Sequence, residues 1–147
     1  MTTRARLIVL VAAALFADRP VFGQTQTADP EAAFKNDVHA TAGLTCTSCH
    51  VVKAGQTIVG LKRTEIAPLC GKCHSDAAYM RKFAPQVRID QLSQYVTSAH
   101  GKRMATGDDR AATCSDCHGA HGVARVSDTR SPVAPLNAAK TCARCHA

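Results

Sequence analysis

The sequence predicts a small domain that is mainly α-helical and irregular, with few or no strands, and three observations support this. No run alternates well enough between apolar and polar residues to form a strand. The 147 residues include no tryptophan, two tyrosines and four phenylalanines, so material for an ordinary core is scarce although 46% of the residues are hydrophobic. The eight cysteines recur in regular groups. A domain so poor in large side chains needs disulfides, metals or cofactors to hold together.

The N-terminal residues predict a secretory signal peptide. An apolar run at residues 7–17 follows two arginines. This run is shorter than the about 20 residues that a membrane-spanning helix needs. Small residues then precede a cleavage point after Gly23. We therefore expect a signal peptide at residues 1–23 and a periplasmic or extracellular protein.

The rest of the chain is expected to form a leader and one domain of two similar modules. Residues 24–34 begin with a polar run without periodicity, which predicts a flexible leader. The order of parts then repeats, because an upstream histidine followed by two cysteine motifs occurs twice. The expected domain is residues 35–147, with modules at about 35–85 and 86–147.

The clearest helix is expected between the modules. An amphipathic pattern with helical spacing is formed by Ile89, Leu92, Tyr95 and Val96. Asp90 is placed to cap the start of this helix, and Gly101 is expected to end it just after His100. A shorter helix is expected at residues 75–83.

All eight cysteines lie in four copies of the motif Cys-x-x-Cys-His, which attaches c-type haem. Two thiols about one helical turn apart can bond to the two vinyl groups of one haem, and the next histidine then lies under the iron as an axial ligand. The expected cofactors are four covalent haem c groups. The cysteines are Cys46, Cys49, Cys70, Cys73, Cys114, Cys117, Cys142 and Cys145, and the histidines that follow them are His50, His74, His118 and His146.

Other uses of the cysteines fit the motifs less well. Zinc sites use paired Cys-x-x-Cys groups, but they do not need a histidine directly after each pair. Structural zinc–thiolate sites are also disfavoured in an oxidising compartment. A thioredoxin-like redox pair needs a strand–helix context that is missing here. Disulfides alone leave the four histidines without a role.

The three histidines outside the motifs are candidate second axial ligands. His39 lies upstream of the first motif, His100 ends the expected helix, and His121 follows the third motif between two glycines. Two imidazoles on one iron favour electron transfer over substrate binding. No catalytic residue is predicted, and the protein is not expected to be an enzyme.

Four haems with two histidines each would need eight, and the chain has seven. Alignment of the modules sets Lys53, three residues after His50, opposite His121, three residues after His118. Lys53 could fill the vacancy, as could the thioether of Met80 or Met104. The iron could also stay open or take a histidine from another subunit, or the chain could be a fragment.

The net charge of +7 does not predict nucleic-acid binding. Four haems would bring eight propionates, which would cancel most of this charge. The lysines and arginines are instead expected to pair with propionates or to dock a redox partner.

From residue 35 to the C-terminus the sequence resembles the class III and doubled-CxxCH multihaem cytochromes c. The resemblance rests on the four motifs, on His39, on Ser-Ala-His-Gly around His100, and on Cys-His-Gly-Ala-His-Gly at residues 117–122. It implies closely packed haems that form the core, with little regular structure around them. It also implies a place in the periplasm or outside the cell, in anaerobic respiration or extracellular electron transfer.

The leading hypothesis is therefore an electron carrier or an electron-transfer subunit of a respiratory chain. Its partners would be redox proteins that donate and accept electrons, including a membrane-bound quinone-oxidising complex. One alternative is a small reductase whose histidine-deficient haem binds an oxidised nitrogen or sulfur compound. Another is a self-associating subunit in which neighbours complete each other's iron ligation.

Overall fold

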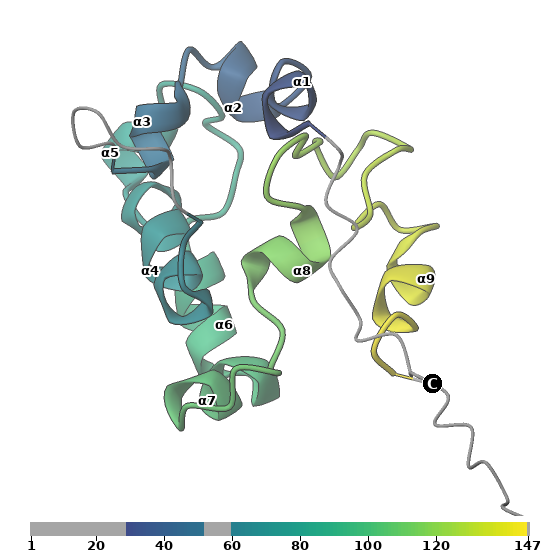
Figure 1. Ribbon diagram of the computed structural model, residues 1–147. Helices are drawn as coiled ribbons and strands as arrows, with labels where there is room; N and C mark the ends of the chain where they lie inside the picture. Colours follow the sequence, from purple (N-terminus) through teal and green to yellow (C-terminus); the bar gives the residue numbers. More distant parts are fainter. Residues whose placement is uncertain (1–28, 52–59, 147) are drawn as a thin grey trace, which may run out of the picture.

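The computed structural model describes residues 29–51 and 60–146 (Figure 1). Within these ranges short helices are joined by turns and no strand occurs, which confirms the predicted fold class. The expected signal peptide and Lys53 lie outside the described residues. The helices are α1 (Pro30–Phe34), α2 (Val38–Thr41), α3 (Cys46–Cys49), α4 (Arg63–His74), α5 (Ala77–Met80), α6 (Gln91–Thr97), α7 (Ala99–Ala105), α8 (Cys114–His118) and α9 (Ala138–Cys142).

The longest of these helices is α4, which the sequence reasoning did not identify. It packs against α6, and it also contacts α5 and α8 (Figure 1). Its first turn is stabilised because a Glu65 carboxylate oxygen accepts the backbone N–H of Lys62 at 2.8 Å. Pro68 lies inside the helix, where it removes one backbone donor without ending the helix. Because α4 belongs to the first expected module and α6 to the second, the two modules share one packed centre.

The helix expected to run from residue 89 to His100 is instead two helices. The break is at Ser98, whose hydroxyl donates to the carbonyl oxygen of Tyr95 and accepts the N–H of Gly101. The prediction that Gly101 ends a helix was therefore wrong, since Gly101 is buried inside α7. A Cβ on Gly101 would overlap the carbonyl oxygen of Tyr95. Glycine at this position lets α7 cross α6 at close range.

Two other short helices also differ from expectation. The helix expected at residues 75–83 is the single turn α5, where an Asp76 carboxylate oxygen accepts the N–H of Tyr79 at 2.9 Å. The helix α1 lies within the segment expected to be a leader. It begins after Asp29, whose carboxylate accepts the N–H of Glu31, and has Pro30 at its first position.

The apolar core is very small for a chain of this length. Among the described residues the buried apolar side chains are Ala67, Met80, Met104, Ala111 and Ala134. Large apolar residues remain at the surface, with Val51 86% exposed and Leu136 93% exposed. Protein contacts alone bury too little apolar surface to offset the entropy of ordering the chain.

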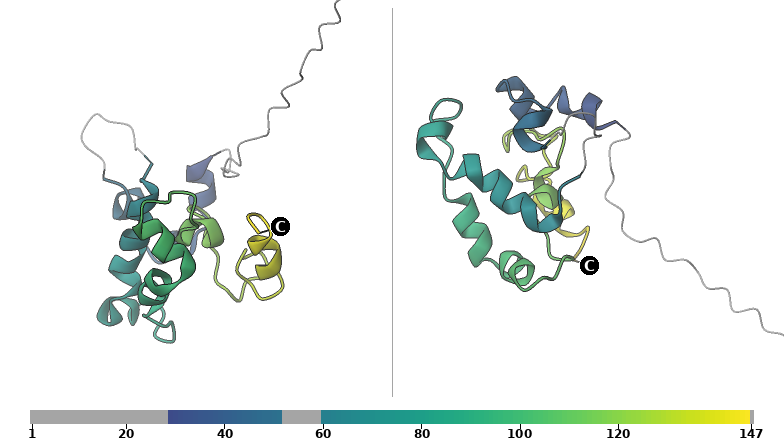
Figure 2. Two further views of the ribbon diagram at one scale, coloured as in Figure 1. Left: turned by 90° about the horizontal axis from the view of Figure 1, so that it is seen from below. Right: turned by 60° about the vertical axis from the view of Figure 1, so that its left-hand side comes forward.

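Helix α8 lies between the group formed by α4, α6 and α7 on one side and α9 on the other, in Figure 1 and in the left view of Figure 2. None of the helices in the described part of the chain is long and apolar enough to cross a membrane.

Candidate functional site

The four Cys-x-x-Cys-His motifs occupy two kinds of local structure, in alternation. The first and third motifs begin short helices, α3 and α8, each directly after a threonine. In each case the residue before the second cysteine turns back to accept the threonine N–H, through Ser48 at 3.0 Å and Asp116 at 2.6 Å. The second motif closes α4, and the fourth begins at Cys142, the last residue of α9. Each thiol pair is thereby held about one helical turn apart.

The thiols of successive motifs are neighbours in space. Burial and then the nearby thiol of Cys73 raise the pKa of Cys49, which links the first motif to the second. The second and third motifs are linked through Cys70 and Cys114, whose side chains interact. This interaction raises the pKa of Cys70 and lowers that of Cys114 to about 7.

The third and fourth motifs are linked in the same way. Burial, the Asp116 carboxylate and the thiol of Cys142 raise the pKa of Cys117. No disulfide joins any of the eight cysteines, all of which lie in described residues. The motifs therefore follow one another in space in the order of the sequence.

Six of the seven histidines form three close pairs. The ring centroids of His39 and His74 are 6.0 Å apart, with the rings perpendicular at 89°. Those of His50 and His121 are also 6.0 Å apart, with an angle of 17°. His100 and His146 are separated by 5.8 Å and inclined at 45°. Each pair joins a histidine that follows a cysteine motif to one of the three that do not.

The spacing of these pairs fits two imidazoles on opposite sides of one metal ion. A metal–imidazole bond is about 2.0 Å and half a ring adds about 1 Å, so two opposite imidazoles have centroids about 6 Å apart. Burial, and then the charges of His39 and His118, lower the pKa of His74. A lower pKa favours the neutral imidazole, which is the form that binds metals.

His118 is the one motif histidine outside the three pairs, and all seven histidines lie in described residues. Burial lowers its pKa. The module alignment pointed to a vacancy beside Lys53 in the first module. The structure instead leaves the odd histidine in the second module, because His121 reaches across to His50.

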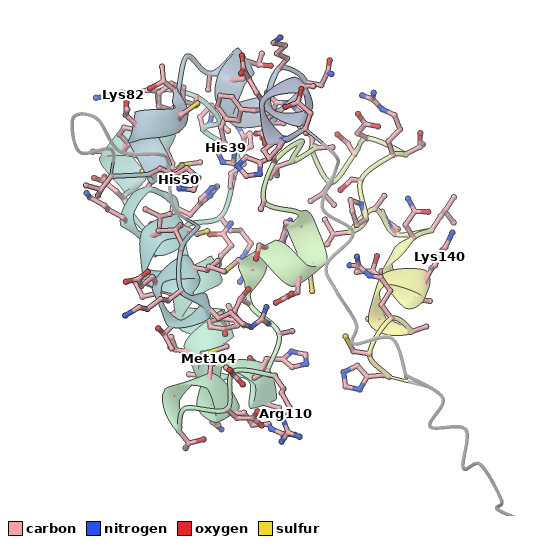
Figure 3. The ribbon with its side chains drawn as sticks, in the orientation of Figure 1. His39, His50, Lys82, Met104, Arg110 and Lys140 are labelled. Carbon is pink, nitrogen blue, oxygen red and sulfur yellow. The ribbon has the colours of Figure 1, made fainter. Side chains whose placement is uncertain are left out.

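The other candidate ligands for the site that lacks a second histidine are two methionines and one lysine. Met80 and Met104 are each 8% exposed. Met80 borders a cavity of about 210 Å³ whose apolar lining includes Pro85, Val87 and Ile89. Met104 projects from α7 and is labelled in Figure 3. Lys53 lies outside the described residues.

The third motif is fixed to the centre of the molecule by an arginine that sequence reasoning missed. The guanidinium of Arg63 donates to the Asp116 carboxylate at 2.7 Å and to the carbonyl oxygen of Ala111 at 2.9 Å. Burial alone would raise the pKa of Asp116, but the hydrogen bonds from Arg63 and Thr113 outweigh it and lower that pKa. The Tyr95 hydroxyl donates to the neighbouring carbonyl of residue 112 at 3.0 Å. These contacts hold α8 against α4 and α6.

A second missed residue is Asp37, which is completely buried. One carboxylate oxygen accepts both the Nδ1–H and the backbone N–H of His39, each at 2.8 Å. The other accepts the backbone N–H of Val123, also at 2.8 Å. Burial alone would raise the pKa of Asp37, and these hydrogen bonds outweigh it and lower that pKa. In Figure 3, His39 and His50 project from α2 and from the end of α3 toward the interior.

Repeated haem-attachment motifs, paired imidazoles and a helical chain with almost no core define a class of protein, the multihaem c-type cytochromes. Within that class, the chain belongs to the cytochrome c3 family, whose sequence model matches residues 38–147. It therefore binds haem c covalently and transfers electrons.

A relative supports this assignment. The chain is 32% identical over 120 residues to the multihaem cytochrome MtrA of Shewanella baltica (strain OS185). The match covers 81% of this chain but 29% of the relative, so the chain spans less than a third of that protein's length. No solved structure matches the chain significantly.

Proposed function

We propose that the chain carries four haem c groups, one on each motif, and conducts electrons along them in the periplasm or outside the cell. It would act as a carrier or as an electron-transfer part of a respiratory chain. The observation that carries this proposal is the set of three histidine pairs at the spacing of opposite ligands on one metal. The mutual influence of thiols from successive motifs supports an arrangement in which each haem would follow the previous one in sequence order.

The protein's own residues would hold and orient the redox groups, while the haems supply the electron-accepting iron. The thiols of each motif would attach one haem, and the histidine after them would bind its iron. His39, His100 and His121 would supply a second ligand in three of the four sites. With both ligands in place these sites would have no position for substrate and would exchange electrons only.

The haem number is tested by mass spectrometry and by a pyridine haemochrome assay on protein from a host competent in cytochrome maturation. The expected result is four haems per chain. Replacing Cys142 and Cys145 by alanine should lower the number to three, with the first three motifs still loaded. Wild-type protein with fewer than four haems, from a host that loads a control tetrahaem cytochrome fully, would refute the proposal.

The unpaired His118 favours a second candidate function, the binding of a small molecule at the haem of the third motif. This candidate predicts that reduced protein binds carbon monoxide at one haem of four. It also predicts a high-spin component in the oxidised spectrum. A fully low-spin protein that ignores carbon monoxide would remove this candidate and show that another ligand fills the site. Dependence of the spectrum on protein concentration would identify that ligand as one from a second copy.

The proposed partners are redox proteins that donate and accept electrons, among them a membrane-bound quinone-oxidising complex. The basic side chains available to dock them include Lys82, Arg110 and Lys140, which project from the surface in Figure 3. Contacts of this kind weaken as salt screens them. Electron exchange with an acidic partner should therefore slow as ionic strength rises.

A further inference from the structure

The burial of Asp37 calls for an explanation, because a buried carboxylate is costly unless a positive charge compensates it. Its side chain is 1% exposed, and its ion-pair partner is His39. In the described ranges no lysine or arginine forms an ion pair with it. Asp37 also caps α2 through the N–H of His39, but capping needs one oxygen and no burial.

The contact with His39 has a chemical consequence for that ring. An ionised carboxylate only accepts hydrogen bonds, so the Nδ1 of His39 must carry the proton. The other ring nitrogen, Nε2, is then left as a lone-pair donor. A histidine bound to a metal commonly donates its second ring N–H to a carboxylate, which fixes the ring and strengthens it as a ligand. The metal charge beyond the ring would also compensate the buried carboxylate.

The second oxygen of Asp37 connects this ligand to another. It accepts the N–H of Val123, and the carbonyl oxygen of Val123 in turn accepts the N–H of Val38 at 2.9 Å. Val123 lies two residues after His121, the partner of His50. Between them Gly122 has φ = +77°, a conformation that glycine adopts at little cost. One carboxylate thus fixes two segments, each of which carries a candidate second ligand.

We infer that Asp37 is a positioning residue for two haem sites: it orients His39 directly and holds the backbone beside His121, and its negative charge makes the His39–His74 site more reducing. This inference rests on the proposed ligation of haem iron by His39 and His74. The carboxylate stabilises the oxidised site, which carries one more positive charge than the reduced site. Removal of the charge should therefore raise the midpoint potential of that site.

The ring angles give two of the sites distinct spectroscopic labels. Perpendicular imidazole planes on ferric low-spin haem produce a highly anisotropic electron paramagnetic resonance signal, and nearly parallel planes produce a rhombic one. The highly anisotropic signal should therefore belong to His39 and His74, at 89°. The rhombic signal should belong to His50 and His121, at 17°. A redox titration followed at each signal then reports the sites separately.

The test is Asp37→Asn in the haem-loaded protein, with Asp128→Asn as the matched control. Asp128 also loses one negative charge, but it forms an ion pair with Arg130, and its side-chain hydrogen bonds all come from Arg130 and none from a histidine. In Asp37→Asn the highly anisotropic signal should titrate at a higher potential and change shape as the His39 ring gains freedom. Asp128→Asn should leave that signal in place. An unchanged signal in Asp37→Asn, or an equal shift of all signals, would overturn the inference.

Two further measurements keep the inference testable if Asp37→Asn does not fold, and they separate it from the proposed ligation by His39. In reduced wild-type protein the Nδ1 proton of His39 should give a downfield, slowly exchanging resonance. Rapid exchange of this proton would overturn the inference without any variant. His39→Ala should add one carbon-monoxide-binding haem. If His39→Ala adds no such haem, the proposed ligation is wrong. If it adds one but Asp37→Asn leaves the highly anisotropic signal unchanged, only the role of Asp37 is refuted.

Discussion

Replacing Gly101 by alanine should release the second ligand of the fourth site. The new methyl group would overlap the carbonyl oxygen of Tyr95 and lie 2.8 Å from both the carbonyl carbon of Tyr95 and the Cα of Val96. Carbon atoms in contact prefer about 3.5–4.0 Å, so α7 must move away from α6 by about 1 Å. Metal–ligand distances tolerate only about 0.2 Å. His100 lies next to Gly101 on α7 and should lose its place opposite His146.

Gly101→Ala should change the free energy of unfolding only modestly, although it displaces His100. Overpacking costs about 1–3 kcal/mol, and the better helix propensity of alanine returns about 1 kcal/mol. The decisive assay is therefore carbon monoxide binding to the reduced protein, read as the number of responsive haems. Gly101→Ala should bind at one haem more than the wild type.

The matched control for this variant is Gly60→Ala. A Cβ on Gly60 meets no atom within 4 Å, and its backbone conformation is open to alanine. It should bind carbon monoxide as the wild type does. A Gly101→Ala protein with wild-type binding and unchanged or raised thermal stability would show that α7 is not held as the structure describes.

Other substitutions test the packing around the second and third motifs. Gly71→Ala should be milder than Gly101→Ala, because the new methyl group meets the flexible side chain of Leu92, so thermal unfolding should shift only modestly and carbon monoxide binding should stay unchanged. Arg63→Met should lower the free energy of unfolding at neutral pH by about 1–3 kcal/mol, since it removes charged hydrogen bonds that are mostly shielded from water. The lowered pKa of Asp116 contributes stability above its usual value of 3.8, and this is lost as pH falls through the folded-state pKa. The difference between Arg63→Met and wild type should therefore shrink in acid denaturation series below pH 3.8, and a difference that persists there would contradict the role of the ion pair.

Local features of the fold were partly readable in the sequence. The apolar spacing around Leu92 and Tyr95 predicted α6, but its end at Ser98 depends on hydroxyl bonds that compete with the helix. The helix α4 was missed because Pro68 inside it looks like a break. Counting cysteines as apolar would have revealed it, since Ile66 and the thiols of the second motif recur at helical spacing.

The residues of the candidate site could be predicted from the sequence, but the pairs that its histidines form could not. Each Cys-x-x-Cys-His motif predicts its first candidate iron ligand, because that histidine directly follows the second cysteine in the sequence. The pairing of the histidines depends on how distant segments pack, and repeat symmetry misled because His121 pairs with His50 of the first module instead of with a histidine of its own module. Arg63 and Asp37 were missed because a charged residue shows its role only when its burial and partners are known.

If the chain is exported and His121 binds the iron of the first haem, as proposed, the pairing of His121 with His50 imposes an order of events on biogenesis. The first motif would leave the export channel early, whereas His121 would emerge only after more than half of the second module has been made. Until then the first haem would keep one side open to solvent or to the maturation machinery. Closing this long loop joins the two halves of the chain, so completion of the earliest haem would be among the last steps of folding.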